Sequence, residues 1–484
     1  ALGGWIALAV VQVPATRAAG GSPAAIVEGR VLNTATGEYL EKARLTVVGG
    51  ALEVFSGPSG EYRLSPVPPG ELKVTVFYTG TVPLTETITV VAGTTVQHDF
   101  NLRSIKDGLA RGGDDRDVVK LDAFTVATSR EMDGAAVAIN QQRFAPNVTN
   151  VVAANEFGIS ADGSVAEFMK YLPGISINYV GGTANTISID GAPTNNVPIT
   201  LGGFDLASTS SASTSRSIEL LQLSIKNLSR LELLQSPTPE SPGSALAGSI
   251  NLVPTNASDF KRPVLDVSAF LIMRDNYRDL RKTPGPLREK SHKVQPGFDF
   301  RYVNPVTKRL GFTLAVSYSN QFLPQDTFQA AWRGAGFATN GTTLPDTSVD
   351  KPYMTDYTLT DARKFNTRKS FGTTVDFKLT PRDILFFAYD YGRFSSEYTN
   401  NALALNVTNV SASGFSPNFT HGLAGGGLTI TSQGRWRGGD THMPTLTYRH
   451  NGPVWSAEAG LGYSRSTNYL RDSDRGYFGS VTAR

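Results

Sequence analysis

Strict alternation of apolar and polar residues is the dominant pattern of this chain, and it is clearest after residue 264. In the segment 312–319, alternate positions are apolar (Phe312, Leu314, Val316 and Tyr318) and the positions between them are small or polar (Thr313, Ala315, Ser317 and Ser319). A period of two residues is typical of β-strands that present different faces to different environments. The strands predicted in this part of the chain are 265–274, 293–304, 310–322, 365–379, 384–398, 437–449 and 454–470.

The connections between these strands alternate in length. The segments 304–308, 380–383 and 450–453 are predicted tight turns, whereas 323–366 and 400–435 are predicted long polar loops. Apolar residues on one face, polar residues on the other, and short turns alternating with long loops are typical of a transmembrane β-barrel. A soluble β-sandwich is the alternative, but it would not need strands of this length.

Residues 259–484 are therefore expected to form a partial outer-membrane β-barrel. The predicted strands are odd in number, whereas single-chain bacterial barrels have even numbers of strands. We expect the chain to be a fragment whose barrel lacks its C-terminal strands.

A separate set of short strands precedes this region. Alternating runs at 27–31, 41–47, 61–64, 71–77 and 86–90 are separated by segments rich in Gly and Pro. Short strands at this spacing predict a small β-sandwich over residues 24–102. The following segment, 103–117, is polar and without periodicity, and it is predicted to be a linker.

An isolated alternating run at 118–127 lies between that linker and a second stretch, 131–145, that we expect to be loose. A single strand without a hairpin partner is marginally stable in water. It would be stabilised by pairing with the sheet edge of another protein. The alternative is that it forms the first strand of the domain that follows.

The domain that follows is predicted to be a small α+β body over 146–258. Apolar residues at helical spacing predict a helix over 164–172, which Pro173 and Gly174 terminate. Strand-like runs follow at 175–179 and 186–191, and a longer element at 225–234 leads into a segment rich in Gly, Ala and Ser.

This order of elements resembles the plug domain of TonB-dependent outer-membrane receptors. The matching pieces are Tyr171-Leu-Pro-Gly-Ile175, Ile187-Ser-Ile-Asp-Gly191, Leu228-Ser-Arg-Leu-Glu-Leu233 and Gly243-Ser-Ala-Leu-Ala-Gly-Ser-Ile-Asn251. The sequence departs from the family pattern in that Asp190 stands where Arg is usual, and Gln235-Ser-Pro-Thr-Pro replaces Arg-Gly-Pro. The family resemblance therefore does not predict which residues form ion pairs between plug and barrel.

The first domain has a resemblance of its own. Gly29-Arg-Val, Gly60-Glu-Tyr-Arg-Leu and Pro69-Gly-Glu-Leu-Lys-Val-Thr-Val resemble the carboxypeptidase regulatory-like domain, whose fold is a transthyretin-like, starch-binding-like sandwich. The resemblance implies no peptidase chemistry. It implies either a periplasmic spacer, which we favour, or a module that binds a carbohydrate or a protein partner.

The plug resemblance implies roles for two sets of residues. The segment 118–145 stands where these receptors keep their TonB box, which a periplasmic energy-coupling protein of the TonB type binds by strand addition. Its predicted coupling strand comprises Leu121, Asp122, Ala123, Phe124, Thr125, Val126 and Ala127. The candidate ligand-facing residues of the plug loops are Tyr179, Asn185, Asn195 and Asn196.

Composition excludes several classes of chemistry. The chain has no Cys and only five His without metal-ligand spacing, which gives no thiolate catalysis and no predicted metal site. We find no catalytic motif and predict no enzyme and no cofactor. A net charge of +3 gives no reason to expect a nucleic-acid partner. Residues 1–23 contain a short apolar run followed by alanines, and we expect a signal-peptide remnant there.

Together these observations predict a mainly β protein in the bacterial outer membrane, with its N-terminal sandwich in the periplasm. The predicted function is energy-coupled uptake of a scarce ligand, with outer-membrane lipid and a coupling protein as further partners. Siderophore, cobalamin and oligosaccharide all remain open as ligands, and the first domain favours a saccharide. The alternative function is a secreted or surface carbohydrate-binding protein of β domains that does not transport.

Overall fold

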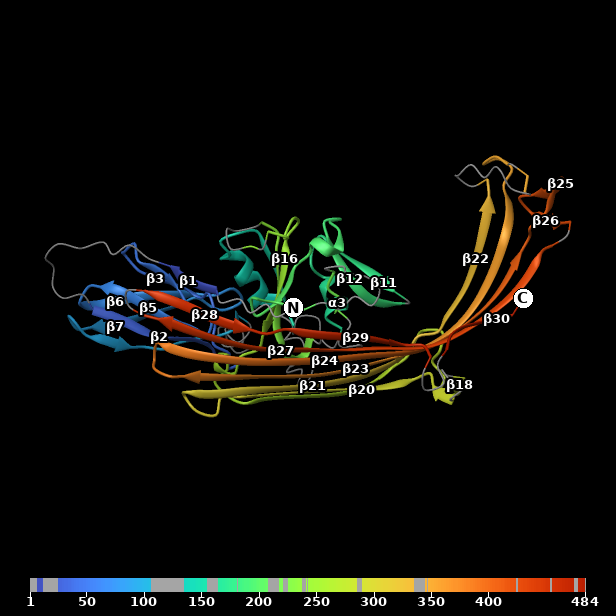
Figure 1. The fold of residues 1–484 in the computed structure, drawn as a ribbon. Coiled ribbons are helices and arrows are strands. Elements are labelled where there is room, and N and C mark those ends of the chain that lie inside the picture. The colour runs from blue at the N-terminus through green and yellow to red at the C-terminus, as the bar shows by residue number, and fades with distance from the viewer. Residues whose placement is uncertain are drawn as a thin grey trace, which may run out of the picture.

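The computed structural model describes residues 7–11, 25–105, 135–154, 164–180, 182–207, 217–220, 225–236, 241, 243–284, 290–334, 344–345, 347–423, 425–452, 455–473 and 478–483. It shows an N-terminal sandwich, a small α+β body that we call the plug, and a large antiparallel sheet. The plug lies over one face of the large sheet, and the sandwich lies at one end of it (Figure 1). At the other end, the long strands curve away from the plane of the sheet.

The sandwich contains two small sheets that enclose a shared core. One sheet contains β5 (Glu61–Val67), β2 (Ala25–Asn33) and β8 (Thr95–Gln97), with β9 (Phe100–Leu102) also paired to β2. The other has the order β4 (Glu53–Phe55), β3 (Arg44–Val47), β6 (Gly70–Phe77) and β7 (Leu84–Val90). Leu45, Leu64, Val74 and Phe100 are completely buried between them.

The predicted sandwich is thus confirmed, and the strands predicted at 27–31, 61–64, 71–77 and 86–90 lie within β2, β5, β6 and β7. Strand β3 begins later than the predicted 41–47. The strands β4, β8 and β9 were not predicted, because a strand of three residues is too short to show alternation.

The expectation of a loose stretch over 131–145 is wrong for its described part, because residues 135–143 are helical. The described part of this helix opens with Ala135-Ala-Val-Ala, and Ala has the highest helix propensity of all residues. Most of the predicted linker and the predicted coupling strand 121–127 lie outside the described residues.

The plug is built on a five-stranded sheet with the order β10 (Thr149–Ala153), β15 (Leu228–Leu234), β16 (Ser249–Pro254), β13 (Ile199–Leu201) and β14 (Phe204–Asp205). The helix α3 (Val165–Met169) and the hairpin of β11 (Ile175–Val180) and β12 (Thr183–Ile189) complete its apolar core. The helix is shorter than the predicted 164–172, and Gly174 beyond it has a φ of 76°.

The unusual Asp190 has a structural explanation. It follows β12 with a φ of 49°, in the left-handed region that Asp and Asn tolerate better than most side chains. Gly191 continues the turn with a φ of 78°. A short polar side chain at position 190 therefore suits the backbone of this turn.

The large sheet is 11-stranded, and all its pairings are antiparallel. Its main order is β17 (Val264–Ile272), β20 (Gln295–Asn304), β21 (Leu310–Phe322), β23 (Tyr353–Lys378), β24 (Asp383–Asn406), β27 (Gly427–Asn451), β28 (Ser456–Gly462) and β1 (Ala7–Val11). In addition, β22 (Gln325–Arg333) pairs with β23, and β29 (Arg465–Arg471) and β30 (Phe478–Ala483) pair with β27. Two small hairpins, β18 (Lys282–Pro284) with β19 (Lys290–His292) and β25 (Val410–Ser416) with β26 (Phe419–Gly422), lie outside this sheet.

The predicted strands are confirmed, with two corrections. The predicted strand 454–470 is two strands, β28 and β29, which pair with different parts of β27. The predicted long loops 323–366 and 400–435 are largely strand. β22 lies in the first and β23 extends into it, whereas β24 and β27 extend into the second, which also contains β25 and β26. Apolar residues such as Leu405, Leu428 and Ile430 do alternate with polar ones in these extensions, but they lie in stretches rich in Gly, Ser, Thr and Asn that resemble loops.

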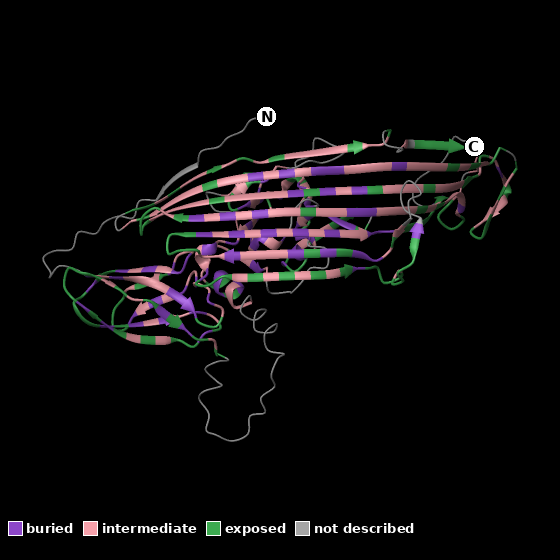
Figure 2. Cartoon of the chain, turned by 90° about the horizontal axis from the view of Figure 1, so that it is seen from below, coloured by how far each residue is buried: buried purple, intermediate pink, exposed green. Residues whose placement is uncertain are grey.

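The two faces of the large sheet have opposite character, as predicted. In β21, Thr313, Ala315, Ser317 and Ser319 are 1–8% exposed on the face toward the plug. The apolar residues between them are only half-buried, and in β17 the outward Leu265 and Val267 are 60% and 58% exposed. The bands of buried and less buried residues along the strands are visible in Figure 2.

Two findings concern the N-terminus and helices. The backbone of β1 pairs with β28, with Ala9 opposite Glu458, while the assignment of residues 1–23 to a signal-peptide remnant stays a prediction. In the part of the chain that the structure describes, no helix combines the length and the apolar character needed to cross a membrane.

The separate core of the sandwich predicts that residues 24–102 fold alone. Amide hydrogen exchange on that piece should show protected amides in β2, β5 and β6. Leu45→Ala should lower its free energy of unfolding by about 2–5 kcal/mol because the side chain is completely buried. Val48→Ala is the matched control, since Val48 is 54% exposed. A piece without protected amides would show that the sandwich depends on the rest of the chain.

Candidate functional site

The interface between the plug and the large sheet is mainly polar, with apolar contacts such as that of Met443 of β27, which belongs to the apolar core of the plug. Lys226 of the plug forms an ion pair of 3.0 Å with Asp299 of β20. Asn366 of β23 donates a hydrogen bond of 2.8 Å to the hydroxyl of Thr183. Glu219 forms an ion pair with Arg437 of β27. These contacts hold the plug at separate points along the large sheet.

Asn227 fits closely between the two bodies. It ends the 3-10 helix η3 (Ile225–Asn227), is 5% exposed, and donates from Nδ2 to Asp390 Oδ1 at 3.0 Å. Gly372 on the neighbouring strand provides the space for it, because a Cβ there would lie 2.6 Å from Asn227 Nδ2. Thr313 donates to the Asn227 side-chain oxygen at 3.5 Å, a long hydrogen bond.

A second group of contacts holds the segment through which the plug enters the sheet. The hydroxyl of Thr374 donates to the carbonyl of Thr255 at 2.9 Å. The backbone N–H of Ser258 donates to Asp376 at 2.6 Å. Ser258 lies in the 3-10 helix η4 (Ala257–Asp259), which connects the plug to β17. The large sheet therefore binds the last turn of the plug through its inward polar side chains.

A cleft lies in this interface, beside the Asn227 contact. Plug residues from β13, η3, β15 and β16 form one side of it, and inward residues of β21, β23, β24 and β27 form the other. Lys226 and Asp390 are its charged lining residues, and Leu201, Leu252 and Met443 are among its apolar ones. The packing of the plug against the large sheet is therefore incomplete beside the Asn227 contact.

The sequence pattern did not identify these contact residues, although part of the signal was present. Lys226 and Asn227 are adjacent polar residues at the start of the run 225–234, in which apolar and polar residues are mixed. Asp390 and Gly372 share a face of β24 and β23, where they are directly opposite each other in the register. The pattern predicts which side chains face inward, but it contains no information on which plug residue meets them.

The candidate ligand-facing residues lie on neighbouring elements of the plug. Tyr179 is 48% exposed near the end of β11, and its hydroxyl donates to Glu167 at 3.3 Å. Asn185 lies in β12, next to Ala184, which is opposite Tyr179 in the hairpin. Asn195 and Asn196 lie in the 3-10 turn η1 (Thr194–Asn196), where Asn195 is exposed. Their role in ligand binding stays a prediction.

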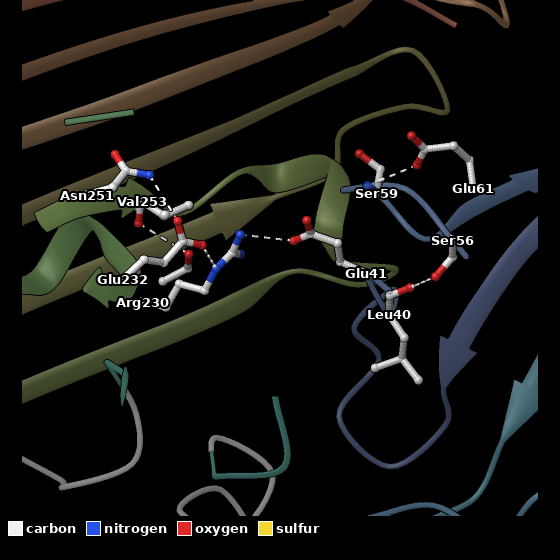
Figure 3. Close-up of polar contacts among 10 residues, drawn as sticks. Leu40, Glu41, Ser56, Ser59, Glu61, Arg230, Glu232, Asn251 and Val253 are labelled. Carbon is white, nitrogen blue, oxygen red and sulfur yellow. Dashed lines mark hydrogen bonds and ion pairs between the residues drawn. The ribbon is translucent and has the colours of Figure 1, made fainter. Parts of the chain in front are cut away.

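At the other end of the plug, an arginine joins it to the sandwich. Arg230 of β15 forms ion pairs with Glu232 at 2.7 Å and with Glu41 of the sandwich at 3.1 Å, and Asn251 donates to Glu232 at 3.1 Å (Figure 3). The Arg230 side chain is 17% exposed. Burial disfavours its charge, but the carboxylates of Glu41 and Glu232 outweigh burial and raise the pKa of the guanidinium.

A substitution tests the fit at Asn227. Gly372→Ala should displace Asn227 and lower the free energy of unfolding by about 1–3 kcal/mol, as overpacking usually does. Gly434→Ala in β27 is the matched control, because its Cβ would meet Phe478 at an ordinary 3.5 Å. Urea unfolding followed by intrinsic fluorescence measures both variants. Equal stability of the two variants would contradict a close fit.

Comparison with known proteins identifies two domains. Residues 26–103 match the carboxypeptidase regulatory-like domain family, and residues 141–249 match the TonB-dependent receptor plug domain family. Both resemblances seen in the sequence are thereby confirmed. No curated protein matches the chain.

Solved structures of receptors are similar in part. A point mutant of the ferric enterobactin receptor PfeA of Pseudomonas aeruginosa, in complex with enterobactin, is 12% identical with a TM-score of 0.34, and the match covers 67% of this chain and 50% of that one. The outer-membrane transporter YddB of Escherichia coli is 11% identical with a TM-score of 0.29, over 66% and 57% of the two chains. The ferric citrate transporter FecA in its unliganded form is 10% identical with a TM-score of 0.28, over 71% and 60%. The chain thus spans between 50% and 60% of the length of these structures.

Proposed function

We propose that this chain, which carries the plug domain of TonB-dependent receptors, acts in the bacterial outer membrane in energy-coupled uptake of a scarce ligand. The observation that carries the proposal is the plug held against the polar face of a large antiparallel sheet by hydrogen bonds and ion pairs. A body held in this way can be displaced, because water can replace each polar contact as it breaks.

The exposed face of the sheet supports the location. Leu265, Val267 and Leu271 of β17 are between 58% and 63% exposed on the face away from the plug. Apolar side chains on the outer face and polar ones inside are what a β-sheet in a lipid bilayer requires. Every backbone group within the bilayer must also be hydrogen-bonded, which the continuous pairing of these strands achieves.

In the proposed mechanism, ligand binding on the outer side precedes pulling from the periplasm. The coupling strand 121–127 would pair with a TonB-type protein by strand addition, in which main-chain hydrogen bonds supply much of the affinity. The pull would then break the polar contacts between the plug and the large sheet. The cleft beside Asn227 interrupts the contact between the plug and the large sheet.

The ligand class is the finer part of the proposal. Hydroxyl and amide groups at Tyr179, Asn185, Asn195 and Asn196 suit a polar ligand. Among siderophore, cobalamin and oligosaccharide, the regulatory-like domain favours a saccharide. The other candidate function is a secreted or surface carbohydrate-binding protein, and it is disfavoured because such a protein needs neither a plug domain nor an apolar outer face.

The experiment that tests this function is an uptake assay with a panel of glycans and siderophores. Cells that produce the receptor should accumulate one of these ligands, and a protonophore should abolish accumulation without abolishing binding. Extraction of the protein should require detergent. Binding without energised uptake, together with extraction into buffer alone, would favour the carbohydrate-binding alternative.

The coupling strand has its own prediction. Phe124→Pro or Val126→Pro should reduce uptake at least tenfold while ligand binding stays unchanged, because Pro removes a main-chain donor and fixes φ. Phe124→Leu is the matched control, since it keeps the N–H group and an apolar side chain. Uptake at the wild-type rate by both Pro variants would remove the assignment of 121–127 as the coupling strand.

A further inference from the structure

The sandwich touches the base of the plug along a narrow polar contact that we call the seam. It includes Arg30, Tyr39, Glu41 and Ser59 of the sandwich, which contact Arg230 of the plug and Ser258 and Asp259 of the segment that connects the plug to β17. The backbone of Lys261 and the side chain of Arg262 in the same segment also donate to the sandwich, at Gly37 and Ala35. Arg30 donates to the carbonyl of Ser258 at 2.7 Å, and the N–H of Tyr39 donates to the carbonyl of Asp259 at 2.6 Å. Glu41 pairs with Arg230 at 3.1 Å, and the hydroxyls of Ser59 and Ser258 are 3.2 Å apart.

No shared apolar core supports the seam among the described residues. The core of the sandwich is formed by residues between Ala25 and Leu102, and the core of the plug by residues between Val152 and Leu252 with Met443 of β27. The two cores have no member in common. The seam therefore consists of contacts that water can replace one by one.

The helix at residues 135–143 makes a different kind of contact with the sandwich. Asn140 is completely buried, donates to the carbonyl of Lys42 at 2.9 Å, and accepts from the backbone and the hydroxyl of Thr79. Val137 packs against the sandwich core, and the rings of Phe144 and Phe55 are 4.9 Å apart. This contact combines apolar burial with a buried polar side chain whose partners lie on the sandwich.

The helix also leads directly into the plug. Residue 149 begins β10, which pairs with β15, the strand that carries Arg230. Gln142 donates to the carbonyl of Val151 at 3.2 Å. A pull on the chain before residue 135 therefore acts first on the helix and on the sandwich bound to it, and reaches β10 afterwards.

We propose that the seam is a release interface, at which the sandwich and the helix 135–143 leave the plug together before the plug itself yields. This inference rests on the proposed function, because it assigns the order of events in energised uptake. The polar seam breaks first because it has no apolar core. The contact between helix and sandwich stays intact because its separation would expose apolar groups and an unpaired Asn140.

Release of the sandwich changes the environment of Arg230. Glu41 departs with the sandwich, and Arg230 keeps Glu232 as its carboxylate partner on the same strand. The strand β15 lies between the edge strand β10 and β16 in the plug sheet. The seam therefore adds a restraint to the strand next to the one on which the pull acts.

Two engineered disulfides test the order of release, and the chain is suited to them because it contains no Cys. Ser59→Cys with Ser258→Cys closes the seam, since the two hydroxyl oxygens are 3.2 Å apart. Thr79→Cys with Asn140→Cys is the matched control, because it closes the contact between sandwich and helix, where the side-chain oxygens are also 3.2 Å apart.

With the seam locked under oxidising conditions, uptake should fall at least tenfold while ligand binding is retained, and a reductant should restore uptake. The lock between sandwich and helix should leave uptake within about twofold of the wild type, because the two parts are proposed to move together. A twofold change in rate corresponds to less than about 1.4 kcal/mol, the free energy of a tenfold change. Wild-type uptake by the oxidised seam variant, or loss of uptake in the oxidised control, would overturn the proposal. An unlocked receptor that shows no energised uptake would instead refute the proposed function.

Single-molecule pulling tests the same order without any transport. The receptor is held in a lipid bilayer and pulled through a peptide tag inserted after residue 128. The first rupture force should fall in Glu41→Gln and stay unchanged in the oxidised Thr79→Cys, Asn140→Cys variant. A first rupture that this lock abolishes would show that the helix leaves the sandwich first, which contradicts a release at the seam.

Discussion

The structure depends on the polarity of its large sheet, in which the buried face is polar and the open face is apolar. The face toward the plug is polar and buried, as Thr313, Asp376 and Ser317 show, while the opposite face is apolar and open. A sheet of this kind cannot be stabilised by an apolar core of its own. It needs a lipid bilayer on the apolar side and a hydrogen-bonding body on the polar side. The plug is that body, and the polar nature of their interface follows from this requirement.

The same logic explains how the parts can separate without unfolding. The sandwich and the plug each enclose an apolar core, and the contacts between the bodies are mainly ion pairs and hydrogen bonds. Breaking such contacts in the presence of water costs less than opening an apolar core, because the polar groups gain water as a partner. Stability is thus concentrated inside each body, and the boundaries between bodies are available for movement.

The sequence predicted what depends on local pattern. Alternation located β20, β21, β24 and the inward positions of Thr313 and Ser317, and short motifs located the plug. The sequence pattern could not predict contacts between distant residues. Glu41 and Arg230 lie in separate domains, and no local pattern pairs them. The helix 135–143 was missed because its helical character is completed by packing on the sandwich. The strand extensions were missed because their apolar residues, such as Leu428 and Ile430, lie in stretches rich in Gly, Ser, Thr and Asn that resemble loops.

The most direct test of this account is a cysteine scan along β21 in lipid vesicles, from position 312 to 319, one substitution at a time. Each thiol carries a fluorophore, and a lipid-soluble quencher is added. The account predicts strong quenching at Phe312, Leu314, Val316 and Tyr318, and little at the positions between them, which face the plug. Uniform quenching, or strong quenching at Thr313, Ala315 and Ser317, would show that the sheet does not separate lipid from plug.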